Sequence, residues 1–156
     1  MSALQHFPRI TPFLWFDSNA EEAVEFYVGV FRNSRRLDSL ANPGDAPVPK
    51  GKLLTMAFEL DGQKFTALNG GPAFKFNEAI SMVVRCDSQE EVDYYWTNLS
   101  SGGAESQCGW LKDKFGLSWQ IVPARLSELL RHPKAMQAMM KMRKLDIAEL
   151  ERAAQE

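Results

Sequence analysis

Few side chains in this sequence are of the types that most often do chemistry. It has two histidines, His6 and His132, and two cysteines, Cys86 and Cys108. Because zinc and non-haem iron sites usually draw on histidine, a metal site here would have to be built almost entirely from oxygen ligands. The cysteines form no Cys-x-x-Cys motif, and two thiols in a chain of this length are not a disulfide framework.

Cys108 is a candidate nucleophile, because Lys112 and Lys114 follow it closely and positive charge stabilises a thiolate. No histidine lies near it in the sequence to act as a base. A structural, chemically inert thiol is therefore the preferred interpretation of Cys108.

Motifs that bind phosphate-bearing or nucleoside cofactors are missing. Gly70-Gly71 precedes a proline and Gly102-Gly103 follows a predicted helix, so neither pair opens the strand-to-helix turn of a cofactor site. Gly51-Lys52 lacks the upstream glycine spacing of a P-loop. We expect no cofactor.

An internal repeat supplies the elements that position any site. Residues 17–27, DSNAEEAVEFY, have a counterpart in residues 87–95, DSQEEVDYY. In both copies a serine, Ser18 or Ser88, stands three residues before a glutamate, which is the capping-box signature of a helix start. Apolar residues then recur at helical spacing. Each predicted helix follows a β-type run, at 10–16 or 80–86.

Three further strand-like runs follow each helix, so each copy is predicted to be strand-helix-strand-strand-strand. Asp61-Gly62 predicts a tight hairpin between two of them. The runs are 35–40, 53–60 and 64–68 in the first copy and 105–110, 111–114 and 117–122 in the second.

The chain becomes helical towards its end, with helices predicted over 127–131 and 133–143 and a third starting at Asp146. Four methionines fall in the middle helix. They are consistent with adaptable core packing or with a surface for a partner or another subunit. They are Met136, Met139, Met140 and Met142.

The composition is that of an ordinary globular protein. Of 156 residues, 45% are hydrophobic and 24% charged, and the formal net charge is −2. This balance disfavours a nucleic-acid binder, which needs a concentrated basic surface. No apolar run is long enough to span a membrane, and the N-terminus lacks the apolar core of a signal peptide. We expect a cytoplasmic protein with one domain over 1–156, made of modules 8–70 and 78–124 and a helical extension 125–156.

The segments 16–27, 67–72, 74–81 and 108–123 resemble the PhnB-like family, which often carries the label 3-demethylubiquinone-9 3-methyltransferase. That family belongs to the vicinal-oxygen-chelate superfamily, with glyoxalase I, extradiol dioxygenases and bleomycin-resistance proteins. The resemblance implies an α+β fold in which tandem βαβββ modules form a cupped mixed sheet, followed by C-terminal helices.

Metal-dependent members of that superfamily take four inward-facing ligands from the first and last strands of each module. In this sequence the resemblance places those positions near Pro12 or Leu14, Ala67, Ile80 or Ser81, and Gln120. Only the neutral amide of Gln120 is a plausible ligand, and it is a poor one for a divalent ion. We therefore predict no metal.

The resemblance implies a concave space along the sheet, for which the sequence offers apolar, aromatic and a few uncharged polar side chains. Alternation along a strand puts half of these side chains on the other face, and the sequence does not say which half. Trp110 and Trp119 are also consistent with a turn-and-packing signature. The predicted ligand-binding set is Phe13, Trp15, Asn69, Ser81, Met82, Trp110, Trp119 and Gln120.

The preferred hypothesis is a metal-free homodimer that binds a small hydrophobic or aromatic molecule. One alternative is an enzyme: a metal-dependent lyase or dioxygenase, or a methyltransferase acting on a demethylubiquinone-like quinone, as the family label implies. Another is an interaction protein that docks through its C-terminal helices.

Overall fold

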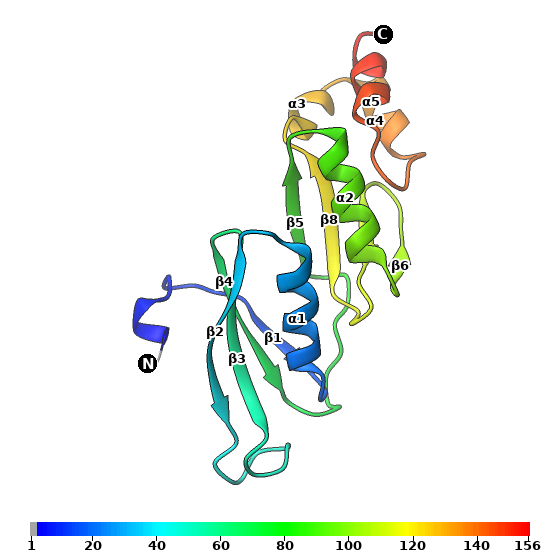
Figure 1. Ribbon diagram of the computed structural model, residues 1–156. Helices are drawn as coiled ribbons and strands as arrows, with labels where there is room; N and C mark the ends of the chain where they lie inside the picture. The colour runs from blue at the N-terminus through cyan, green and yellow to red at the C-terminus, as the bar shows by residue number, and fades with distance from the viewer. Residues whose placement is uncertain (1–2) are drawn as a thin grey trace. The chain divides into compact units, whose positions relative to one another are not determined.

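The computed structural model describes residues 3–156, which form two compact units that divide after Lys75. Each unit is built on one four-stranded mixed sheet with a helix on one face (Figure 1). The units are described separately below.

The first unit has the order strand-helix-strand-strand-strand. Its sheet has the order β1-β4-β3-β2, in which β1 runs parallel to β4 and the other pairs are antiparallel. A short 3-10 helix, Ala3–His6, precedes β1. The elements are β1 (Phe13–Phe16), α1 (Ala20–Val30), β2 (Ser34–Ala41), β3 (Leu53–Leu60) and β4 (Gln63–Asn69).

The second unit repeats this order and adds three helices. Its sheet, β5-β8-β7-β6, has the same topology, with β5 parallel to β8. The tandem βαβββ fold predicted from the repeat is therefore confirmed. The elements are β5 (Ser81–Cys86), α2 (Gln89–Ser100), β6 (Ala104–Glu105), β7 (Trp110–Lys112), β8 (Ser118–Pro123), α3 (Leu126–Leu129), α4 (Pro133–Met139) and α5 (Ile147–Ala154).

The two repeated helices start differently, although their sequences predict the same cap. Ser88 caps α2 as expected, its side chain accepting a hydrogen bond from the amide of Glu91 at 3.2 Å. The prediction for Ser18 was wrong, because α1 begins one residue later, at the N-cap Asn19, whose side chain makes no cap hydrogen bond. The Oδ1 atom of Asn69 on β4 accepts from the amide of Ala20 instead, at 2.9 Å.

In the first unit α1 packs on one face of its sheet. The buried Tyr27 of α1 stacks on Phe58 of β3, with ring centroids 6.2 Å apart, and Phe58 stacks on Phe65 of β4 at 5.1 Å. The hairpin between β3 and β4 turns at Asp61 and Gly62, whose φ angles of 49° and 88° match the predicted tight turn.

In the second unit α2 covers the equivalent face, burying Val92, Trp96 and Leu99. The side chain of Gln89 on α2 connects the C-terminal segment to this core through two hydrogen bonds. Its Oε1 accepts from the amide of Ile147 at 2.8 Å, and its Nε2 donates to the carbonyl of Leu145 at 3.0 Å.

The strand predicted over 105–110 was wrong, because β6 ends at Glu105 and Trp110 begins β7. Cys108 and Gly109 interrupt it with φ angles of 60° and 85°. Their amides donate to the carbonyls of Met142 and Arg143, each at 2.8 Å, so these backbone groups bind the C-terminal segment instead of a neighbouring strand.

Two of the four methionines of the C-terminal region match the core-packing interpretation. Met142 is buried in a cluster with Leu129, Leu145 and Leu150, and Met139 packs against that cluster. Met136 and Met140 are exposed.

Candidate functional site

Alternation along β5 and β8 gives the second sheet two distinct faces. Val84 and Ile121 are buried on the face that α2 covers. The opposite face, which we call the open face, carries Ser81, Val83 and Arg85 of β5. In register with them are Ser118, Gln120 and Val122 of β8. Val83 is 60% exposed, which is unusual for a valine in the middle of a strand.

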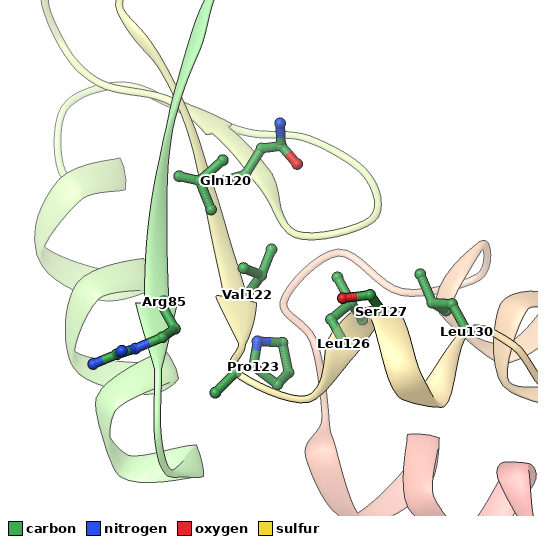
Figure 2. Close-up of a pocket in the computed structure, with 9 residues that line it drawn as sticks. Arg85, Gln120, Val122, Pro123, Leu126, Ser127 and Leu130 are labelled. Carbon is green, nitrogen blue, oxygen red and sulfur yellow. The ribbon is translucent and has the colours of Figure 1, made fainter.

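A groove of about 350 Å³ lies on this open face, between the sheet and α3 (Figure 2). Val83 and Val122 line it from the strands, and Leu126 and Leu130 line it from α3 and its C-cap. Val122 and Leu126 also pack against the buried cluster of the C-terminal helices, which supports this side of the groove. The remaining lining residues are Arg85, Gln120, Pro123, Ala124 and Ser127.

Gln120 is the uncharged polar group on the sheet side of the groove. Its Nε2 donates to the hydroxyl of Ser81 at 2.9 Å, and it stands in register with Trp110 of β7, on the same face. Three of the eight predicted ligand-binding residues, Ser81, Trp110 and Gln120, therefore lie together. Of these, Gln120 lines the groove itself.

Met82 and Trp119 lie in register with one another on the face that α2 covers. Trp119 is 3% exposed, and its indole Nε1 donates to Oδ2 of the buried Asp113 at 2.9 Å. Oδ1 of Asp113 accepts the amides of Phe115 and Leu117, at 2.9 and 3.1 Å. These contacts match the turn-and-packing interpretation of Trp119 and keep it away from the groove.

The remaining predicted residues belong to the first unit. Phe13 and Trp15 alternate with the buried Leu14 and Phe16, so they lie on the face of β1 away from α1. The Trp15 indole donates to the carbonyl of Gly71 at 2.9 Å and meets Phe74 edge-on, with ring centroids 4.8 Å apart. The ring lies so close to Gly70 that a Cβ there would stand 2.5 Å from it.

Asn69 is buried in the first unit, and its side chain makes two hydrogen bonds. Besides accepting from Ala20, it donates through Nδ2 to the carbonyl of Leu53 at 3.0 Å. Both bonds link neighbouring elements of the fold, so Asn69 acts as a structural bridge between α1, β3 and β4.

The apolar part of the groove was not predicted from the sequence; it consists of Val83, Val122, Leu126 and Leu130. Two signals were available. Leu126 and Leu130 are spaced i, i+4, which places them on one side of a helical turn, and Val83 and Val122 alternate with the residues of the buried face.

The cations on the open face are paired with carboxylates. Arg85 Nε lies 3.6 Å from Asp87 Oδ1, and Lys112 Nζ lies 2.7 Å from Glu78 Oε2. The hydrogen bond from Lys112, followed by a backbone hydrogen bond and the charge of Lys112, holds the pKa of Glu78 below its usual range.

The two cysteines are unbridged and differ in access. Cys86 is 1% exposed on the face that α2 covers, and burial, followed by the charges of Glu91 and Asp87, raises the pKa of its thiol to about 12. Cys108 is half-buried at the turn between β6 and β7. No group of three or more His, Cys, Asp or Glu side chains within residues 3–156 is arranged to hold a metal ion.

The positions that the resemblance assigns to metal ligands do not fit a divalent cation. Leu14 and Ala67 are apolar and buried on the face that α1 covers. Ile80 precedes β5, and Ser81 and Gln120 present a neutral hydroxyl and a neutral amide that bond to one another. Such a donor set supplies no negative charge to compensate for the hydration that an ion loses on binding.

Tandem βαβββ units with this strand order define the glyoxalase/bleomycin-resistance fold of the vicinal-oxygen-chelate superfamily, and solved structures share it. The PhnB protein from Bacillus cereus superposes with a TM-score of 0.68 at 32% identity, covering 75% of this chain and all of that one. Protein PA1353 from Pseudomonas aeruginosa gives 0.60 at 22% identity, covering 74% and 97%. The fosfomycin resistance protein FosX from Listeria monocytogenes gives 0.58 at 15% identity, covering 79% and 96%, and supports the fold alone.

The family model described as 3-demethylubiquinone-9 3-methyltransferase matches residues 8–122. The chain belongs to this PhnB-like family. No curated protein matches the sequence. Across residues 3–156, none of the helices has the length and apolar character needed to cross a bilayer.

Proposed function

We propose that this protein binds a small hydrophobic or aromatic molecule on the open face of its second sheet, without a bound metal. The observation that carries the proposal is the groove, whose apolar floor and wall stand beside two uncharged polar groups, Gln120 and Ser127. Ligand sites in proteins typically combine a concave apolar surface with a few orienting polar groups. A volume of about 350 Å³ suits a small molecule.

The metal-free part of the proposal is supported by the donor set at Ser81 and Gln120. FosX has been crystallised with Mn(II) and shares the fold at 14% identity. Function resides in the site and not in the fold, so this likeness does not transfer a metal to the present chain.

The test is a screen of hydrophobic and aromatic compounds, including quinones, followed by backbone amide chemical shifts in ¹H–¹⁵N spectra. We expect the compounds that bind to change the amide chemical shifts of residues in β5, β8 and α3. Val83→Trp fills the groove and should abolish binding. Thr97→Trp, at an exposed site on α2, is the matched control and should leave binding intact. The proposed site would be contradicted by compounds whose affinity is unchanged in Val83→Trp, or whose chemical-shift changes fall outside β5, β8 and α3.

The description of the family supplies a second candidate, methyl transfer to a demethylubiquinone-like quinone. Isothermal titration with S-adenosylmethionine separates the two candidates, because a methyltransferase must bind the methyl donor. Metal analysis of the purified protein addresses the metal-free claim, and stoichiometric zinc, nickel, manganese or iron would overturn it.

A further inference from the structure

Two uncharged polar side chains line the groove, Gln120 on the sheet side and Ser127 on α3. The Nε2 atom of Gln120 donates a hydrogen bond to the hydroxyl of Ser81. Within the described part of the chain, the Oε1 atom of Gln120 has no hydrogen-bond partner. Figure 2 shows this oxygen on the side of the amide that faces α3, with the nitrogen on the opposite side. A carbonyl oxygen only accepts, so it selects a ligand group that donates.

The charges around the groove do not favour an ion. Arg85 lines the groove, but in Figure 2 its guanidinium points away from Ser127 and Leu130. It is paired with Asp87, and Lys112, further along the same face, is paired with Glu78. An anionic ligand would have to displace or approach one of these carboxylates, and a cation would find no unpaired carboxylate among the lining residues.

Resting on the proposed function, we infer that the ligand is an uncharged molecule with an apolar body and one hydrogen-bond donor, such as a phenolic or alcoholic hydroxyl. The apolar body of the ligand contacts Val83 and Val122 of the sheet on one side and Leu126 and Leu130 on the other. Its hydroxyl donates to Oε1 of Gln120, and the hydroxyl of Ser127 lies on the opposite wall of the groove.

The experiment compares three probes of nearly equal size on the full-length protein at pH 7. They are 4-propylphenol, which donates, 4-propylanisole, which does not, and 4-propylbenzoate, which is an anion. Affinities come from titrations followed by ¹H–¹⁵N spectra, which also report the Gln120 side-chain amide. We expect the phenol to bind about five- to tenfold more tightly than the anisole, as one added hydrogen bond implies, and the benzoate to bind most weakly.

The variant Gln120→Met keeps the length of the side chain and removes the acceptor, so it should erase the preference for the phenol over the anisole. Gln63→Met, the same change on the exposed hairpin of the first unit, is the control and should preserve that preference. The comparison of the three probes on the unaltered chain stands even where Gln120→Met fails to fold.

The outcomes separate this inference from the proposed function. Equal binding of phenol and anisole in the groove, or tighter binding of the benzoate there, overturns the inference and leaves the groove as a ligand site. Failure of all three probes to bind on the open face at millimolar concentration counts against the proposed function itself.

Discussion

Replacing Asp113 by asparagine tests the assignment of Trp119 to the fold instead of the ligand site. The carboxylate of Asp113 is 2% exposed and accepts three hydrogen bonds, from Trp119 and from the amides of Phe115 and Leu117. An amide of the same shape has one accepting atom. In one orientation its NH₂ faces the indole N–H, and in the other it faces the two backbone amides, so at least one buried donor loses its acceptor.

The expected cost follows from these contacts. A buried donor left without a partner costs about 1–3 kcal/mol, and the surviving bonds lose the extra strength that a charged acceptor gives. We therefore expect Asp113→Asn to lower the free energy of unfolding by about 2–4 kcal/mol. Asp87→Asn, which breaks only an exposed ion pair with Arg85, is the control and should cost less than about 0.5 kcal/mol.

The assay is urea unfolding followed by far-ultraviolet circular dichroism, because changes to tryptophan complicate fluorescence. A double-mutant cycle with Trp119→Phe isolates the indole contact. Because Trp119→Phe removes the donor that opposes the new NH₂, the double variant should be more stable than the sum of the single effects predicts, by about 1–2 kcal/mol. A loss below about 0.5 kcal/mol for Asp113→Asn, or strict additivity in the cycle, would refute the reasoning.

Three further predictions concern other buried or paired groups. Asn69→Ala removes the bridge to Ala20 and Leu53, so it should lower the free energy of unfolding by about 1–3 kcal/mol in urea titrations, without changing the affinity of ligands that bind the groove. Iodoacetamide at pH 8 should label the half-buried Cys108 and spare Cys86, whose buried thiol has its pKa raised to about 12; mass spectrometry of the native protein showing equal labelling would contradict this. The hydrogen bond from Gln89 and the contact with Lys144 lower the pKa of Asp93 below 3.8. The stabilising contribution of the Asp93 carboxylate is therefore complete above that pH and is lost as the pH falls through the lowered value. Hydrogen exchange of the α5 amides should show reduced protection in acid, and Asp93→Asn should make this acid-induced reduction smaller.

The fold was predictable because its signals are local and the helix-start signal occurs in both copies of the repeat. The Asp-Ser-x-x-Glu pattern stands at the start of a helix in both copies, and the Asp61-Gly62 turn forms where it was predicted, because both signals act through neighbouring residues. The prediction failed where tertiary contacts replace local ones. Asn69 supplies the acceptor that Ser18 was expected to provide, and the carbonyls of Met142 and Arg143 take the amides of a segment predicted to be a strand.

The site was less predictable, because the alternation along a strand shows which side chains share a face but not which of the two faces lines the site. Shifting the assignment by one residue moves every side chain to the opposite face. Ser81 and Gln120 were named together with Met82 and Trp119, yet packing against α2 places the two pairs on opposite faces of one sheet. The apolar wall was missed for another reason: Leu126 and Leu130 come from a helix outside the repeat, which the family motifs do not describe.

The pairing of Ser81 with Gln120 brings no negative charge to this part of the open face. Carboxylates grouped at one site repel each other, and a bound metal relieves that repulsion. A neutral hydroxyl and a neutral amide bond to one another at 2.9 Å and create no such repulsion. The same pair leaves the carbonyl oxygen of Gln120 available to accept, and the specificity proposed for the ligand depends on this oxygen. Ser81→Ala should therefore weaken the discrimination between phenol and anisole, because the Gln120 amide would lose the contact that fixes its orientation.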